Sequence, residues 1–489
     1  MTISAALSIA TGGLANINSQ LAVVSQNVAN ASTPGYSVEI GTQQDLVADG
    51  VGLGVRTGPA TRDVDAALQA EVFSQNATVA GLQTRQNALQ AIDAVQGTPG
   101  QGSDIASLIG NLQDQFSTLL NDPSSEAQQS QVVSAATTLA QGINTLSDAY
   151  TTQRQTAQDN IVAEVATLNS TLGSIGGLSN QIVALQANGQ STADLENQRD
   201  AAVATLSQLV NVKVLEQPNG DALITTTAGL TLPTQGATSP LSTSDVNVAP
   251  NDYYPNGGIP AITLGGVDVT SQLQGGQIGA NIALRDTTLP TDQAELDELA
   301  ENAASRFSAN GLTLFTEPDG TLPVNTPPPA QNGYVGFANS IQVNPAVQAD
   351  PSMVRDGDVP PASALAGYTD IINAVLNDVL GSNPPLVSQV SGLGPAGNLN
   401  APYVSPPTLG QLASTMLAAQ SQDSATTTDQ LATEQAVQTT LGSKLSSQSG
   451  VSMDTEMSNM IQLQNAYGAN AKVIAAVQSM WTQLLNSVQ

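Results

Sequence analysis

The stretch ISAALSIATGGLANINSQLAVVSQNV, residues 3–28, places apolar residues at alternating steps of four and three. This heptad spacing puts them on one narrow face of a helix. Gly12 and Gly13 lie inside the pattern, and each costs about 1 kcal/mol relative to alanine. We therefore expect the helix to need another element packed along its apolar face. That face consists of Ile3, Leu7, Ala10, Leu14, Ile17, Leu21, Val24 and Val28.

The helix is expected to stop at the turn Thr33-Pro34-Gly35-Tyr36. The residue before a proline is disfavoured in the helical region, which ends the helix at Thr33. Gly35 can adopt the positive φ that the third position of a type II turn requires. The sequence therefore predicts a helix over residues 1–33 followed by a sharp turn.

A second amphipathic helix is predicted at the other end of the chain, over residues 451–489. Its apolar residues recur every seven positions, with others in the intervening register. They are Met460, Tyr467, Ile474 and Trp481, with Met453, Met457, Ala471 and Leu485 between them. The two terminal helices are compatible with an ordinary hairpin inside one core. Because four of the seven Met residues and the only Trp follow residue 450, an adaptable face that meets several neighbours is the alternative.

The composition excludes several classes of function. The 489 residues suffice for about three domains. With no Cys and no His, disulfides, thiolate chemistry, Ser-His-Asp catalysis and imidazole metal sites are excluded. A net charge of -29, with 11 basic residues that do not cluster, argues against nucleic acid and anionic membranes as partners. No basic start precedes an apolar stretch, so we expect neither a cleaved secretory signal nor membrane insertion.

The middle of the chain is predicted to change from helix to strand near residue 210. A helix starting at the N-cap Ser103 is expected to end at Asp122-Pro123. Further helices are expected over residues 132–175, as a rod of 40 or more residues, and over 194–209 and 291–307. Alternating apolar residues predict strands over 210–214, 222–227 and near 261–269.

Proline-rich sequence marks the last internal region. Residues 317–410 hold more than half of the 26 prolines and show no periodic apolar stripe. We expect loop-rich β structure that projects from the body and tolerates change.

The fold class expected from these patterns is α+β and multidomain. The N- and C-terminal helices pair in a helical bundle or coiled coil, next to a long-helix body with inserted, outward β-rich domains. The expected parts are a terminal-helix polymerisation unit of 1–60 with 445–489, a helical body of 61–210 with 280–316 and 408–444, a β module of 211–279, and a proline-rich β and loop outer domain of 317–407.

None of the motifs examined for chemistry predicts catalysis. Gly50-Val51-Gly52-Leu53-Gly54 has neither the spacing of a dinucleotide loop nor a following Lys-Ser/Thr, so a tight β turn is expected. Arg199-Asp200 and Arg285-Asp286 are expected to be local salt bridges. The densest acidic cluster is expected to form a solvated helix face, although converging carboxylates could serve a glycosidase or a cation site. Its members are Asp292, Glu295, Asp297, Glu298 and Glu301. No catalytic residue, metal or cofactor is predicted.

Both ends of the chain resemble one family. NVANASTPGYS, residues 27–37, resembles the N-terminal signature of bacterial flagellar rod, hook and hook-associated proteins. EMSNMIQLQNAYGANAKVI, residues 456–474, resembles that family's closing helix. Ser32, where the family usually has Asn, and Gly468, where it usually has no glycine, are departures. Residues 50–68, 194–212 and 275–299 resemble the hook-associated members more specifically than the rod and hook proteins.

The resemblance implies a structural subunit without enzymatic activity that joins hook to filament. It implies export in an unfolded state through the flagellar type III apparatus, without a cleaved signal, to an extracellular flagellum. The implied partners are further copies of the chain, the hook protein, a second hook–filament junction protein, an export chaperone and the export apparatus. The implied assembly interface comprises the apolar faces of both terminal helices next to the turn of residues 33–36. Its residues are Ile3, Leu7, Leu14, Ile17, Leu21, Val24, Val28, Met457, Met460, Tyr467, Ile474, Trp481 and Leu485.

Two alternatives remain at this point. The chain could be another axial subunit of hook or rod, or an exported carboxylate-dependent hydrolase or surface-binding protein that uses its β region. The paired terminal heptads favour the structural subunit.

Overall fold

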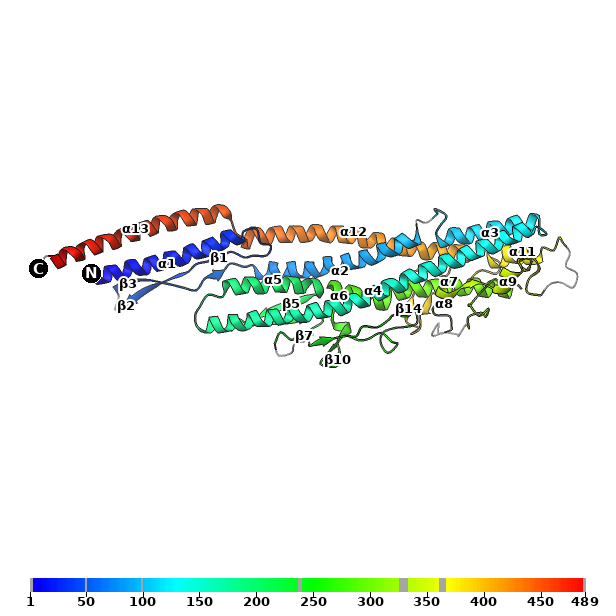
Figure 1. The fold of residues 1–489 in the computed structure, drawn as a ribbon, viewed down its shortest axis with the longest axis horizontal. Helices are drawn as coiled ribbons and strands as arrows, with labels where there is room; N and C mark the ends of the chain where they lie inside the picture. Colours follow the sequence, from blue (N-terminus) through cyan, green and yellow to red (C-terminus); the bar gives the residue numbers. More distant parts are fainter. Residues whose placement is uncertain are drawn as a thin grey trace.

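The computed structural model describes residues 3–48, 51–97, 100–235, 240–324, 333–359 and 366–486. The molecule is elongated, and both termini lie at one end (Figure 1). Helices α1 (Ile3–Asn30) and α13 (Met453–Asn486) form that end, and the long helices of the body run on from it. The expected α+β class with paired terminal helices is confirmed. Among the described helices, none is long and apolar enough to cross a lipid bilayer.

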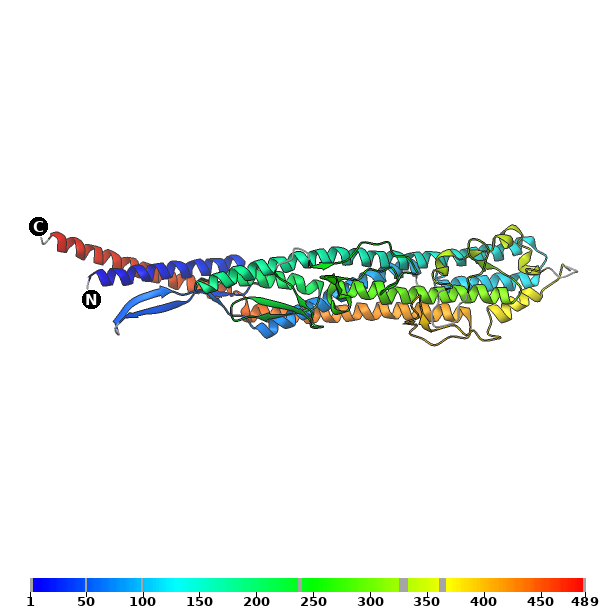
Figure 2. The ribbon, with the colours of Figure 1, turned by 90° about the horizontal axis from the view of Figure 1, so that it is seen from below.

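The body is built around α4 (Glu126–Ala187), a single helix of 62 residues. At 1.5 Å per residue it is roughly 93 Å long, so the expected rod is confirmed and is longer than expected. Against it pack α2 (Ala66–Gln96) and α3 (Ile105–Asn121). Helix α12 (Leu409–Ser449) packs on α2 and α3, and Figure 2 shows these helices running along the long axis. The N-cap of α3 is Asp104, whose Oδ1 accepts a hydrogen bond from the Ser107 amide at 3.0 Å, and not Ser103 as expected.

A second apolar core lies where α4 meets α5 (Ala193–Leu209) and two small antiparallel sheets. The first sheet contains β5 (Val212–Glu216), β6 (Ala222–Thr226) and β7 (Thr231–Leu232). The second contains β8 (Leu241–Ser242), β9 (Thr263–Leu264) and β10 (Val267–Asp268). The 3-10 turn η1 (Thr270–Gln272) then leads through α6 (Gly276–Ala283) and the π-helical turn η2 (Leu284–Thr288) into α7 (Leu289–Ala309). The predicted switch to strands after residue 210 is confirmed.

The proline-rich region differs from the expected outward β domain. It contains the short helices α8 (Phe337–Ser340), α9 (Pro345–Ala349), α10 (Met353–Asp356) and α11 (Asp370–Ala374), and the π-helical turn η3 (Val375–Val379). Among its described residues, β12 (Gln342–Val343) pairs with β11 (Phe315–Thr316), which lies just before the region, and β13 (Ser391–Leu393) pairs with β14 (Leu399–Asn400). Phe337, Val354 and Val375 are buried in the same core as α3, α4 and α7. Single apolar residues from successive short turns enter this core, which is why no periodic stripe exists in the sequence.

Near the termini, a hairpin of β2 (Gln43–Ala48) and β3 (Val51–Thr57) lies along α1. The pair β1 (Glu39–Ile40) and β4 (Thr61–Arg62) closes its base. Within the glycine-rich stretch for which a tight β turn was expected, residues 51–54 belong to strand β3, and Gly50 lies outside the described residues. Gly54 has a φ of +121° and lies against the backbone of Ile9, close to a register irregularity between Leu46 and Val47.

Candidate assembly interface

Helices α1 and α13 pack against each other in antiparallel orientation. Near the body, Asn27 Nδ2 of α1 donates to Glu456 Oε2 of α13 at 3.2 Å. Near the free end, Gly13 of α1 faces the side chain of Asn470. The pair buries Ile17, Val24 and Val477, among others, so the predicted pairing of the ends is confirmed within one chain.

The glycines inside α1 have a packing role. A Cβ on Gly12 would lie 3.3 Å from the Val55 carbonyl oxygen of β3, and a Cβ on Gly13 would lie 3.2 Å from Asn470 Nδ2. The hairpin and α13 therefore approach α1 closely on adjacent sides. The two glycines lower the helix propensity of α1. Their lack of side chains is also what allows the hairpin and α13 to pack so closely against it.

The predicted interface residues fall into two groups in the single chain. Ile17 and Val24 are buried, and five others are partly buried: Leu14, Leu21, Val28, Met460 and Ile474. Leu7, Met457, Tyr467, Trp481 and Leu485 are exposed. The side chain of Ile3 lies outside the described residues. The internal contacts of the pair thus leave a large part of the predicted face uncovered.

The predicted turn has the expected geometry. The Tyr36 amide donates to the Thr33 carbonyl at 3.2 Å, and Gly35 has a φ of +78°. Helix α1 ends at Asn30, three residues earlier than expected. The turn directs the chain back toward α1, where Tyr36 OH donates to Asn27 Oδ1 at 3.1 Å.

Asn27 is the centre of a hydrogen-bond network at the base of the terminal pair. It is fully buried. Its Nδ2 donates to the Glu39 carbonyl at 2.8 Å, and its Oδ1 accepts from the Glu39 amide at 3.0 Å. With the bonds from Tyr36 and to Glu456, one amide side chain joins α1, the segment after the turn, and α13.

The same segment is fastened to α5 of the body. Asn197 Oδ1 accepts from the Ser37 amide at 3.2 Å, and Asn197 Nδ2 donates to the Ser37 carbonyl at 3.1 Å. Arg62 of β4 forms ion pairs with Glu196 at 2.9 Å and Asp200 at 2.7 Å. Burial, and then the nearby Asp194 charge, raises the pKa of the Glu39 carboxyl. This polar joint holds the terminal pair to the body.

Sequence reasoning did not predict the joint. Asn27, Arg62 and Asn197 lie in three separate stretches that resemble the family, residues 27–37, 50–68 and 194–212, whereas Glu39 lies outside all three. Apolar residues that pack together are recognised by their regular spacing, whereas these Asn, Glu and Arg residues show no such spacing in the sequence. Their meeting depends on the return of the chain after the turn at Gly35.

The acidic cluster of α7 is buried, so the expectation of a solvated face is wrong. Glu295 is 3% exposed and Asp297 is 1% exposed. Asp297 accepts hydrogen bonds from the amides of Gly336 at 2.8 Å and Ala338 at 2.9 Å, and Glu298 accepts from Tyr334 OH at 2.6 Å. Segments that fold back over α7 cover this face, and the carboxylates bind their backbone.

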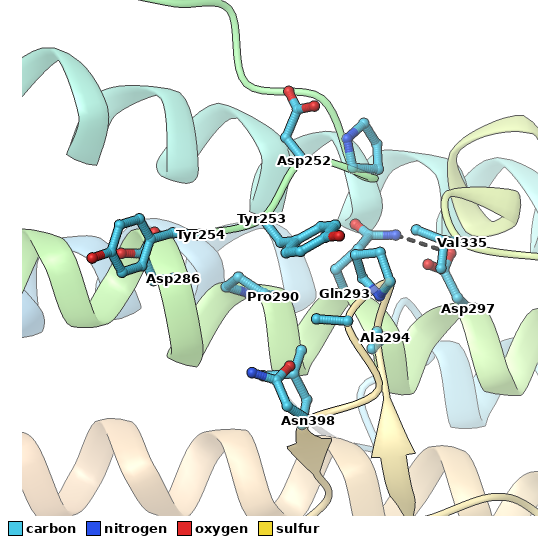
Figure 3. A pocket seen from close by; sticks show the side chains of 15 residues that line it. Asp252, Tyr253, Tyr254, Asp286, Pro290, Gln293, Ala294, Asp297, Val335 and Asn398 are labelled. Carbon is cyan, nitrogen blue, oxygen red and sulfur yellow. Dashed lines mark hydrogen bonds between the residues drawn. The ribbon is translucent and has the colours of Figure 1, made fainter. Parts of the chain in front are cut away.

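Two of these carboxylates, Glu298 and Glu301, line an open groove of about 450 Å³. Within it, Glu298 accepts hydrogen bonds from Tyr334 OH and from the Gln389 amide, both at 2.6 Å. Asp297 instead borders a small space between α7 and the loop of Asp252 and Tyr253, which measures about 20 Å³ (Figure 3). That volume holds about one water molecule. Within the part of the chain that the structure describes, no group of three or more acidic side chains could hold a metal ion.

The arginines of the body bind internal acceptors. Arg285 pairs with Asp286 as expected, at 2.7 Å. Arg199 does not pair with Asp200, because it pairs with Glu216, while Asp200 pairs with Arg62. Arg154, 1% exposed, donates to the carbonyls of Arg285 at 3.2 Å and Asp252 at 2.7 Å. These side chains fasten loops to helices.

Family models of flagellar proteins match three parts of the chain. A model of the flagellar hook-associated protein FlgK helical domain matches residues 89–320. A model of the flagella basal body rod protein matches residues 7–36, and one of the flagellar basal body rod FlgEFG protein C-terminal region matches residues 444–487. The chain is thus similar to flagellar hook-associated protein 1 in its body and to flagellar rod proteins at both ends.

Relatives with that name include the hook-associated protein 1 of Salmonella typhimurium, 26% identical over 63% of this chain and 56% of the relative. The protein of Bacillus subtilis is 22% identical over 96% of this chain and 95% of the relative. The match thus spans little more than half of the Salmonella relative's length. A solved structure of the flagellar hook junction protein FlgK from Burkholderia pseudomallei is similar over 52% of this chain and 45% of that one, with 25% identity and a TM-score of 0.42.

The matched segments correspond to parts of the fold. The rod-protein model covers most of α1 and the turn, and the C-terminal model covers the end of α12 and α13. The hook-associated helical-domain model covers α3 to α7 with the two small sheets. The chain therefore combines terminal helices similar to those of the rod proteins with a body similar to the helical domain of the hook-associated protein.

Proposed function

We propose that the chain is a structural subunit of the bacterial flagellum that joins hook to filament and assembles through its terminal helices. The proposal rests on the exposed apolar surface of α13. Large apolar residues that face solvent in the single chain mark a surface that another protein covers. They are Met453, Met457, Ile461, Tyr467, Val473, Met480, Trp481, Leu484 and Leu485.

The proposal extends to the binding partners of the chain and to its export from the cell. We propose that the chain contacts copies of itself, the hook protein and a second hook–filament junction protein. An export chaperone and the flagellar type III apparatus would carry it unfolded to the outside of the cell. Structural assembly without catalysis is favoured because Asp297 and Glu298, two of the α7 carboxylates of the hydrolase alternative, accept hydrogen bonds from backbone amides of neighbouring segments.

Trp481→Asp tests the proposal at one exposed position. Trp481 is 52% exposed, so we expect the free energy of unfolding of the monomer to stay within about 0.5 kcal/mol of the parent. In the assembly, a buried unpaired charge costs several kcal/mol in every subunit. We therefore expect no incorporation into hook–filament junctions and release of filament subunits into the medium, measured by immunoblot of isolated flagella and of culture supernatant.

Gln435→Asp on α12 is the control, since it adds the same charge at an exposed position of the body. It should assemble normally. Normal junctions and swimming in the Trp481→Asp strain would refute the proposal. A lower thermal midpoint of the purified Trp481→Asp monomer would instead mean that Trp481 belongs to an ordinary core.

A further inference from the structure

The free tip of α13 extends past the start of α1. The two helices are antiparallel and in constant register, since Asn27 contacts Glu456, and Gly13, 14 residues earlier, contacts Asn470, 14 residues later. In this register Ile3 lies opposite Met480. The residues after Met480 therefore pass the first described residue of α1, and Figure 1 shows the C-terminus beyond the N-terminus. Trp481 and Leu485 are 52% and 57% exposed.

This tip, defined as residues 473–486, carries no charge. Lys472 is the last charged residue of the chain. Burial of the tip thus desolvates no ionised side chain, and its large apolar groups gain roughly 25 cal/mol for each Å² removed from water.

A groove of about 500 Å³ lies at the opposite end of the same helix pair. It is bounded by α1, by the segment from Val38 to Gly41, and by α13. Its apolar lining includes Val23, Val24, Val38, Leu463 and Ala466. Because residues of both helices line it, Val24 of α1 and Leu463 of α13 among them, the groove lies along the α1–α13 pair.

The acidic residues of the groove favour an occupant without negative charge. Glu39 and Glu456 line it, and no basic residue does. An acidic segment would be repelled there, which disfavours most of the surface of a chain with a net charge of -29. The uncharged apolar tip meets no such repulsion, and a bulky indole fits a groove of this size.

We propose that the α13 tip of one copy docks in the groove of a second copy. This rests on the proposed self-assembly and names the contact that carries it. The groove residue Asn459 and the tip residue Trp481 are 22 positions apart on one helix, or about 33 Å at 1.5 Å per residue. A tip cannot reach its own groove along a straight helix. The contact is heterologous, joins copies staggered by about this length, and repeats from copy to copy.

Cysteine crosslinking tests the contact, because the natural chain has no Cys. The variant carries Trp481→Cys and Val23→Cys. Flagella are isolated from swimming cells, oxidised with copper phenanthroline, and blotted for the chain after electrophoresis without reductant. We expect a ladder of covalent multimers that dithiothreitol reverses. Leu485→Cys with Val23→Cys is the second pair, for use if the loss of Trp481 prevents assembly.

The matched control is Trp481→Cys with Ser25→Cys. Ser25 is exposed, lies two residues from Val23 on α1, and does not line the groove. It should give at most one tenth of the crosslinked product. Equal or stronger crosslinking through Ser25 would place the tip on another face. If the Val23 variants assemble and swim but form no ladder, the docking proposal is wrong while the junction function stands. A mixed product with a different flagellar protein would assign the groove to that partner and overturn the second-copy occupant.

Discussion

At the scale of single residues, buried carboxyl groups set how the body responds to pH. Burial, and then the charge of Asp292, raises the pKa of Glu295 to about 9. Burial raises the pKa of Asp297 to about 7 against the opposing effect of the Gly336 and Ala338 amides. An unfolded glutamate has a pKa of about 4.3. Between about pH 4.3 and 9 the folded chain thus keeps a proton on Glu295 that the unfolded chain releases, so stability falls as pH rises.

Glu295→Gln should flatten this dependence, because the amide needs no proton to stay neutral. We expect the free energy of unfolding at pH 8 to rise by about 1 kcal/mol or more, with little change at pH 4.5. Urea unfolding followed by circular dichroism at both pH values measures this. Glu71→Gln, on an exposed part of α2, is the control. Parallel loss of stability in the parent and in Glu295→Gln between pH 5 and 8 would show that Glu295 is ionised in the fold.

At the scale of elements, α4 runs through Gly176-Gly177, where the apolar pattern in the sequence ended. The two glycines have different surroundings. A Cβ on Gly176 would lie 1.7 Å from the Thr234 carbonyl oxygen, whereas a Cβ on Gly177 would meet nothing within 4 Å. Gly176 thus permits the backbone after β7 to contact the helix.

Adjacent alanine substitutions should therefore have opposite effects. Gly177→Ala gains helix propensity and should stabilise the chain by about 1 kcal/mol. Gly176→Ala should destabilise it, because the backbone at Thr234 must move. Thermal unfolding of both variants gives the two signs directly. Equal stabilisation by both would mean that the segment after β7 does not rest on α4.

At the scale of the whole molecule, the proline-rich region is part of the body. Its short helices add side chains to the main core, and the loops from Tyr334 to Ala338 satisfy the buried carboxylates of Asp297 and Glu298. An inserted domain that projects outward can be removed at a small loop-closure cost. A segment that completes a core cannot, since its removal leaves cavities and unpaired polar groups.

Replacing residues 322–400 with a Gly-Ser linker should therefore destabilise the helical body, contrary to the expectation from sequence. A lower thermal midpoint and faster proteolysis of α4 would be the readouts. Phe337→Ala, at 1% exposed, should cost about 3–5 kcal/mol. Val404→Ala, at 83% exposed, should cost almost nothing. A deleted chain that unfolds at the parent temperature would restore the outward-domain interpretation.

The amino-acid sequence alone determined the terminal helices, the turn at Gly35, the long central rod and the change to strands after residue 210. These features follow from local spacing, from proline and glycine conformation, and from neighbours within a few residues. Only the tertiary structure decided that Asn27, Asn197 and Arg62 meet in one joint, that the α7 carboxylates are buried, and that Gly12, Gly13 and Gly176 admit close neighbours. Each of these features depends on contacts between segments far apart in the chain. Polar residues and glycines that make such contacts show no regular spacing in the sequence from which the contact could be predicted.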